Sequence, residues 1–161
     1  HFQPIVSAHD GHVVAYEALM RPQLPTLRSP LTVMQLASEM GRLYDIEKLT
    51  FFRACECYEE LEAAGKLDAD ALIFVNSIAS VSLSEEDWAS YCEAHSAILP
   101  KLVVEITEEE EMNERELERK RNVPGSTGVF ALDDYGSGYS NGNSLLTIAP
   151  KYVKVDHHPG H

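Results

Sequence analysis

The sequence predicts an α/β fold in which short, mainly parallel strands alternate with long helices. Its later apolar runs are almost continuous in Val, Ile, Leu and Phe, as expected of parallel strands that are covered on both faces. Helical stretches separate these runs, and repeated strand–helix units build a parallel sheet, of which a barrel is the closed version. With 161 residues, 44% of them apolar, the chain has the size and composition of one globular domain.

Six apolar runs are the expected strands. They are Ile5–Ser7, Val13–Leu19, Ala71–Asn76, Leu102–Thr107, Gly128–Asp133 and Tyr152–Asp156. The first two runs flank a His-Asp-Gly-His segment at residues 9–12, which has the composition of a hairpin turn. We therefore expect the first two strands to form an antiparallel pair.

The helices between these strands have recognisable end signals. Thr32 is a candidate N-cap for a helix that ends near Gly41, and a longer helix spans roughly Tyr44 to Ala64. Ser84, followed by three acidic residues, begins another helix. The charged stretch from Glu108 to about Arg121 is interpreted as a helix with a solvated face.

The charge and cysteine content exclude several classes of protein. Thirteen basic and 26 acidic side chains give a net charge of −13, which argues against binding DNA or RNA but allows a small phosphate ligand if cations lie between it and the protein. Cys55, Cys57 and Cys92 are interpreted as reduced thiols, which suits a cytoplasmic protein. We expect no membrane segment, because no apolar run approaches the ~20 residues of a membrane helix, and no secretory signal.

Polar side chains follow successive apolar runs at the points where the strands are expected to end. They are Glu17, Asn76, Glu105, Asp133, Asp134, Lys154 and Asp156. Carboxyl ends of parallel strands share one rim, where α/β proteins place their active sites. Carboxylates gathered there repel one another unless cations hold them ionised, and their oxygen atoms favour Mg²⁺ or Mn²⁺ over zinc. The adjacent Asp133 and Asp134, on an extended chain, are expected to point to opposite sides.

At these residues the sequence resembles the EAL-domain family, bacterial phosphodiesterases that hydrolyse cyclic di-GMP. The matching landmarks are Gln3-Pro4-Ile5, Tyr16-Glu17-Ala18-Leu19-Met20-Arg21, Val75-Asn76, Glu105-Ile106-Thr107-Glu108, residues 133–140 (DDYGSGYS) and Val153-Lys154-Val155-Asp156. They occur in the family's order and with similar spacing. The resemblance implies a modified TIM-type (β/α)₈ barrel whose first strand is antiparallel to the rest.

The resemblance also implies a role for each site residue. Glu17, Asn76, Glu105 and Asp133 are expected to bind one Mg²⁺ or Mn²⁺ ion, with Asp133 bridging to a second ion that Asp134 helps to hold. Lys154 is expected to position the attacking water, and Gln3 and Arg21 to contact the substrate. Glu108 matches an acid that braces the loop beginning at Asp133, which lies near the family's dimer interface and is consistent with a homodimer.

The length departs from a complete barrel of this type. Such barrels have ~250 residues, so we expect residues 1–156 to be an incomplete EAL-type phosphodiesterase domain whose last two strands, with a second-metal glutamate, are missing. Residues 157–161 are a histidine-rich tail of open origin. The predicted function is metal-dependent hydrolysis of cyclic di-GMP to the linear dinucleotide, in the cytoplasm or in the cytoplasmic part of a larger sensory protein. The alternatives are an inactive EAL module that binds cyclic di-GMP or a protein partner as a sensor, and an unrelated Mg²⁺-dependent barrel enzyme.

Overall fold

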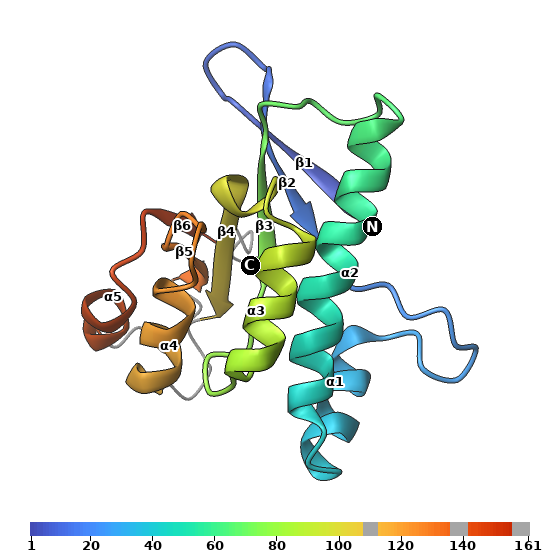
Figure 1. The fold of residues 1–161 in the computed structure, drawn as a ribbon, viewed down its shortest axis with the longest axis vertical. Coiled ribbons are helices and arrows are strands. Elements are labelled where there is room, and N and C mark those ends of the chain that lie inside the picture. Colours follow the sequence, from blue (N-terminus) through green and yellow to red (C-terminus); the bar gives the residue numbers. More distant parts are fainter. Residues whose placement is uncertain (108–112, 136–141, 156–161) are drawn as a thin grey trace, which may run out of the picture.

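The computed structural model describes residues 1–107, 113–135 and 142–155, and it consists of one six-stranded sheet with helices packed against it (Figure 1). The strands are β1 (Phe2–Val6), β2 (Val13–Ala18), β3 (Leu72–Asn76), β4 (Leu102–Thr107), β5 (Val129–Tyr135) and β6 (Tyr152–Val155). They lie in the sheet in the order of the sequence. β1 is antiparallel to β2, and every later pair is parallel, so the chain forms an α/β half-barrel with the predicted antiparallel first strand.

The N-terminal strand begins earlier than the apolar run predicted. β1 starts at Phe2 because Phe2 pairs with Ala18 and Gln3 pairs with Glu17 across the antiparallel ladder. Neither Gln3 nor Pro4 has strong strand propensity. The pairing with β2, rather than local composition, therefore sets where β1 begins.

In the described part of the chain, six helical segments connect the strands. They are α1 (Pro30–Glu39), α2 (Leu43–Ala63), α3 (Glu85–Ala94), the short 3₁₀ segment η1 (Leu99–Lys101), α4 (Glu114–Arg121) and α5 (Gly142–Ile148). The prediction that Thr32 is the N-cap of the first helix is wrong. α1 already begins at Pro30, and Ser29 occupies the N-cap position. Proline suits the first helical position, since its fixed φ is helical and its missing N–H would have no partner there. The prediction that Ser84 begins a helix is confirmed, because Ser84 is the N-cap of α3 and its Oγ accepts a hydrogen bond from the Asp87 N–H at 3.1 Å.

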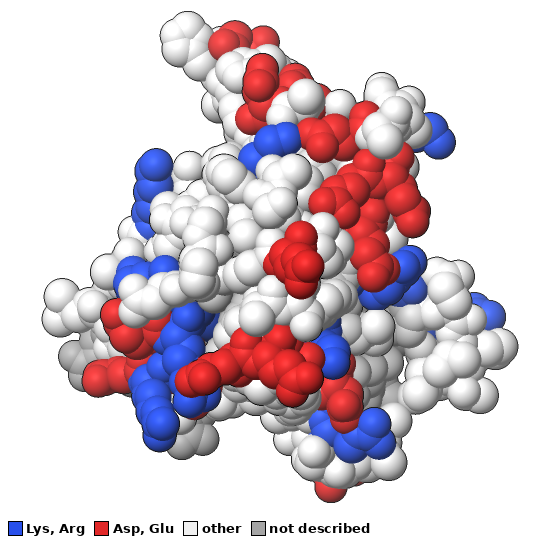
Figure 2. All heavy atoms as spheres, viewed as in Figure 1, with Lys and Arg blue, Asp and Glu red and all other residues white. Residues whose placement is uncertain are grey.

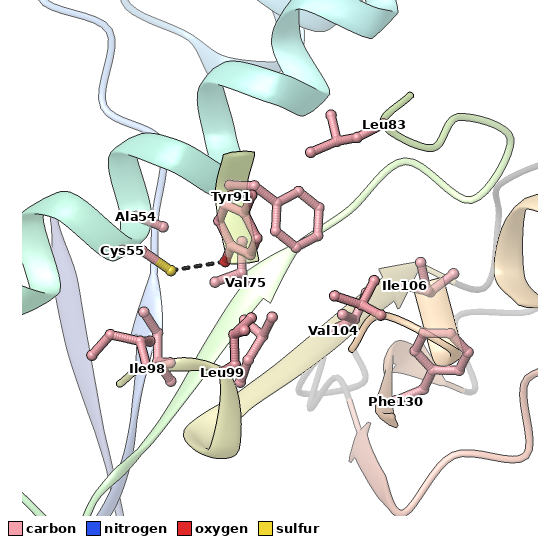
Figure 3. Close-up of a cluster of buried hydrophobic side chains, with 14 of the residues drawn as sticks. Ala54, Cys55, Val75, Leu83, Tyr91, Ile98, Leu99, Val104, Ile106 and Phe130 are labelled. Carbon is pink, nitrogen blue, oxygen red and sulfur yellow. Dashed lines mark hydrogen bonds between the residues drawn. The ribbon is translucent and has the colours of Figure 1, made fainter. Parts of the chain in front are cut away.

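The main core lies between the sheet and these helices. Figure 3 shows Val75, Val104 and Phe130 from three neighbouring strands on one side, with Ala54 of α2 and Tyr91 of α3 among the facing side chains. The Cys55 Sγ and Tyr91 Oη atoms lie 2.8 Å apart within this core. Cys55, Cys57 and Cys92 are all free thiols, as predicted.

A smaller apolar cluster lies on the other face of the sheet. Its buried members are Ala15, Phe74, Val103 and Ala131, and Tyr152 packs against them. Successive side chains of a strand point to opposite faces, so these residues alternate with the strand residues of the main core. All five parallel strands thus contribute residues to this inner face.

The exposed surface is unevenly charged. Figure 2 shows acidic side chains along α2 and over the first turn of α3, and a group of basic side chains over α4. Within the described residues, no helix combines the length and the apolar character that crossing a membrane requires.

Candidate functional site

The predicted site residues lie on the same inner face, each two positions further along its strand than a residue of the apolar cluster. Ala15, Phe74, Val103, Ala131 and Tyr152 are followed at the second position by Glu17, Asn76, Glu105, Asp133 and Lys154. Because side chains repeat on one face every two residues, this spacing brings the polar set to the same face, at the carboxyl ends of the strands. Asn76 and Glu105 are direct partners in the ladder, whereas Glu17 pairs with Phe74 and Asp133 pairs with Thr107.

Three carboxylates of this polar set converge on one point. Ligand oxygens of Glu17, Glu105 and Asp133 all lie within 4.8 Å of one another. The Lys154 ammonium lies among them, with Nζ 3.0 Å from Glu17 Oε1 and 3.4 Å from Asp133 Oδ1, and it also donates to Glu105 Oε1. Strands β2, β4, β5 and β6 thus each supply one charged group to a single cluster.

Glu105 is the most buried member of the cluster, with 1% of its surface exposed. Its Oε1 accepts from Lys154, but its Oε2 is buried and has no hydrogen-bond partner among the described residues. Burial raises the pKa of Glu105 to about 8; the Lys154 ammonium opposes this shift, and the charges of Glu17 and Asp133 add to it. For Lys154 burial acts to lower the pKa, but its contacts with Glu105, Glu17 and Asp133 outweigh burial and raise it above the ordinary value.

These residues fit a hard divalent cation. Three carboxylates face a single ammonium group, and oxygen ligands of this kind suit Mg²⁺ or Mn²⁺. A buried acceptor oxygen with no partner is costly, and a cation is the partner that would satisfy it. Asn76, in register with Glu105 at the end of β3, adds a neutral oxygen on the same face. The roles of the individual ligands remain predictions.

Asp134 does not follow the extended geometry expected for two adjacent aspartates. Its φ of 55° lies in the left-handed region, and the pairing of β5 with β6 shifts register between Leu132 and Tyr135. The expectation of a regularly extended chain at these two residues is therefore wrong, because the strand bulges there, and the opposite directions of the two side chains stay a prediction. Asp133 belongs to the carboxylate cluster, while the metal role of Asp134 remains a prediction.

The two expected substrate residues lie in different places. Gln3 is exposed and stands directly opposite Glu17 in the antiparallel pair, so both side chains share one face of the sheet beside the cluster. Arg21 donates a 2.9 Å hydrogen bond to the Met20 carbonyl and lines a pocket of about 530 Å³ with residues of β1 and α2, such as Phe2 and Leu49. The substrate roles of both residues stay predictions.

Several predicted positions lie outside the described residues. They are Glu108, Asp156, residues 136–141 of the loop after Asp134, and the tail at 157–161. The predicted bracing of that loop by Glu108 therefore remains a prediction.

Sequence reasoning missed a second group of charged residues close to this site. Glu47 of α2 and Lys120 of α4 are each 1% exposed and lie 3.1 Å apart. The charged stretch that contains Lys120 was interpreted as a solvated face, which is wrong for this residue. Helical periodicity offered a signal, because Glu47 precedes the buried Phe51 by four positions and Lys120 follows the buried Leu117 by three.

Fold and site together define an α/β half-barrel with an acidic cluster, of a kind that could hold a metal ion, at the carboxyl ends of its strands. The EAL domain family matches residues 1–158, and this chain belongs to that family. PdeG of Escherichia coli strain K12, described as a probable cyclic di-GMP phosphodiesterase, is 28% identical over an alignment of 163 residues that covers 97% of this chain and 32% of PdeG. The cyclic di-GMP phosphodiesterase NbdA of Pseudomonas aeruginosa is 30% identical over an alignment of 165 residues that covers 97% of this chain and 21% of NbdA.

Solved structures give the same family relationship. The PaMucR phosphodiesterase in complex with c-di-GMP superposes with a TM-score of 0.76 at 26% identity, over 97% of this chain and 65% of that one. BlrP1 of Klebsiella pneumoniae, solved as a manganese/cy-diGMP complex, gives a TM-score of 0.69 over 96% of this chain and 39% of that one. At 21% identity, BlrP1 supports the fold alone. The alignments described above cover 32% of PdeG and 21% of NbdA, so this chain spans at most about a third of either relative.

Proposed function

We propose that this domain hydrolyses a phosphodiester bond of cyclic di-GMP, yielding the linear dinucleotide, in a reaction that depends on Mg²⁺ or Mn²⁺. The observation that carries the proposal is the convergence of Glu17, Glu105 and Asp133, from three different strands, within 4.8 Å of one another. Membership of the EAL family and the similarity to PdeG, NbdA and PaMucR support cyclic di-GMP as the substrate.

Glu17, Glu105 and Asp133 would hold the first metal ion, with the amide oxygen of Asn76 beside Glu105. A bound divalent cation lowers the pKa of its water and stabilises charge on phosphate oxygens. The cluster suits this task because its carboxylates outnumber its cation, and because the unpartnered Glu105 oxygen faces no competing donor among the described residues. Asp134, directly after Asp133, is the proposed contributor to a second ion.

Lys154 would donate hydrogen bonds to the attacking water or to a phosphate oxygen. Its raised pKa keeps the amine protonated at neutral pH, so it serves as a donor and a positive charge and does not accept a proton. Its position, 3.0 Å from Glu17 and 3.4 Å from Asp133, places it beside the proposed metal ligands. We assign it the positioning of water against the phosphate.

Gln3 and Arg21 are proposed to contact the substrate outside the metal ligands, and Glu108 to brace the loop after Asp134. Gln3 lies beside the cluster through its pairing with Glu17. Arg21 lies in the segment that follows β2, close in sequence to Glu17, and its guanidinium suits a phosphate. A homodimer and a cytoplasmic location are further predictions from the sequence.

A turnover assay tests the proposal. Purified protein is incubated with cyclic di-GMP and Mg²⁺, Mn²⁺ or Ca²⁺, and the linear product is separated by chromatography. We expect product with Mg²⁺ or Mn²⁺, and loss of both Mn²⁺ binding and turnover in a Glu17→Ala variant that keeps its circular dichroism spectrum. Asp45→Ala, at an exposed carboxylate of α2, is the control that keeps full activity.

Two outcomes would contradict the proposal. Full turnover by Glu17→Ala would remove Glu17 from the site. Tight binding of cyclic di-GMP without turnover under any of the metal conditions would identify a sensor module in place of an enzyme.

A further inference from the structure

A second lysine–carboxylate pair lies between helices, away from the solvent. Glu47 of α2 and Lys120 of α4 are both 1% exposed, and Lys120 Nζ lies 3.1 Å from Glu47 Oε1. Removing two charges from water costs several kcal/mol per ion, and apolar residues of similar size are often equally stable or more stable. General stability is therefore a weak reason for this pair to exist, and its other contacts point to a more specific role.

Those contacts converge on two consecutive residues, Ser77 and Ile78. Ser77 Oγ donates to Glu47 Oε1 at 2.6 Å, and the Ile78 N–H donates to Glu47 Oε2 at 2.9 Å. Lys120 Nζ donates to the Ile78 carbonyl. Both carboxylate oxygens and the ammonium thus hold the backbone and side chain of one short segment.

Ser77 and Ile78 follow Asn76 directly at the end of β3. The Ser77 N–H also donates to the Glu105 carbonyl at 2.9 Å, which ties the segment to β4 at another proposed ligand. The segment is therefore fixed on two sides, by Glu105 in the sheet and by the ion pair between the helices. With its next two residues held, Asn76 has little freedom to rotate or shift along the strand.

We propose that the buried Glu47–Lys120 pair is a positioning device that holds Asn76 in place for the metal site. Neither residue touches the carboxylate cluster; the pair acts through Ser77 and Ile78. The proposal rests on the proposed function, because it takes Asn76 to be a metal ligand.

Residues that support a metal ligand from outside the coordination sphere change metal affinity by roughly 10- to 100-fold when they are replaced. Loss of the contacts from Glu47 and Lys120 is therefore expected to weaken Mn²⁺ binding about 10-fold or more. The carboxylate cluster itself stays intact, so binding is weakened and not abolished.

The test compares two double variants in the full chain by Mn²⁺ titration, read by electron paramagnetic resonance. Glu47→Leu with Lys120→Met removes both charges and the hydrogen bonds to Ser77 and Ile78. Glu47→Gln with Lys120→Met removes the same charges, but the amide can still bond to Ser77 and Ile78. We expect Mn²⁺ binding to weaken by about 10-fold in the leucine variant and by less in the glutamine variant, which lacks only the Lys120 bond to the Ile78 carbonyl.

A matched control sits on the same helix. Glu62 of α2 pairs with Lys101 at 2.6 Å, and this pair contacts none of the proposed ligands. Glu62→Leu with Lys101→Met should lower the melting temperature and leave Mn²⁺ affinity unchanged, which separates a loss of stability from a loss of positioning. If the leucine variant at position 47 does not fold, Ser77→Ala carries the test, because it removes one bond of the same set, and weaker Mn²⁺ binding is again expected.

The outcomes separate the two proposals. Equal Mn²⁺ affinity in the unmodified chain and in the Glu47→Leu and Lys120→Met double variant, or in Ser77→Ala, would overturn the positioning role and leave the metal site standing. Equal weakening of Mn²⁺ binding in the leucine, glutamine and Glu62 variants would show that the effect comes from lost stability, and this result would also overturn the positioning role. No Mn²⁺ binding by the unmodified chain would overturn the proposed function and this proposal with it.

Discussion

The Glu47–Lys120 pair and the inner-face cluster around Lys154 both join lysine to carboxylate, and their difference shows which of the two is built to accept a ligand. Between α2 and α4, one lysine meets one carboxylate, and both Glu47 oxygens have partners. On the inner face of the sheet, one lysine meets three carboxylates, and one Glu105 oxygen has no partner among the described residues. A balanced, fully bonded pair fixes structure, whereas an unbalanced cluster with an unpartnered oxygen can take up a cation.

Exposure separates the two clusters in the same way. Lys120 and Glu47 are both buried, while 30% of the Lys154 side chain and 23% of the Asp133 side chain are exposed. A small charged ligand can therefore reach the inner-face cluster from solvent, while the pair between the helices is sealed. The comparison predicts different responses to the same substitutions.

The largest effect is expected from removing each lysine in turn. Lys120→Met leaves the Glu47 carboxylate buried without its partner, so we expect a loss of about 3–5 kcal/mol in the free energy of unfolding. Lys154→Met should cost less than half as much, because Glu17 and Asp133 reach solvent and Glu105, with its raised pKa, can remain protonated. Urea unfolding of the two variants in a chelator measures the difference. Equal losses would remove the distinction between the clusters.

The next effect concerns pH. The Glu105 pKa is raised from 4.5 to about 8, so the folded chain binds a proton that the unfolded chain releases over this range. This contribution to stability is present at low pH and is lost as the pH rises toward about 8, at roughly 1 kcal/mol per pH unit. Glu105→Gln should remove that slope.

Urea unfolding at about pH 5.5 and about pH 7.5, in a chelator, tests this inside the window. Burial also raises the pKa of Glu47, but that group is present in both proteins and cancels in the comparison. Identical pH slopes in the unmodified chain and in Glu105→Gln would show that Glu105 titrates normally.

The smallest effect concerns the backbone beside the inner-face cluster. Asp134 has a φ of 55°, a left-handed conformation that a residue with a Cβ other than Asn or Asp adopts at a cost of about 1–2 kcal/mol. Asp134→Gly and Asp134→Ala both remove the side chain, so their difference isolates the backbone. We expect the glycine variant to be more stable by about 1 kcal/mol in thermal unfolding. An alanine variant of equal stability would mean that the bulge relaxes at no cost.

The sequence by itself determined the strands of the sheet and pointed to the four charged residues that converge on its inner face. The apolar runs gave β4 at Leu102–Thr107 without error, and the others to within a few residues. It could do so because strand pattern is local. A polar residue two positions after a buried one on a parallel strand lies on the same face, so Glu17, Glu105, Asp133 and Lys154 could be placed together before any contact was known.

The tertiary structure decided what depends on packing between distant segments. Lys154 and Glu105 are 49 positions apart in the sequence. Their contact, and the contacts of the Lys154 ammonium with Glu17 and Asp133, arise only because the folded sheet brings β2, β4, β5 and β6 together. The bulge at Asp134 arises from the shifted pairing of β5 with β6. The Glu47–Lys120 pair exists because α2 and α4 bury one charged residue each at the same place. Composition suggests that a charge is solvated; only the packing of a neighbouring helix removes the solvent.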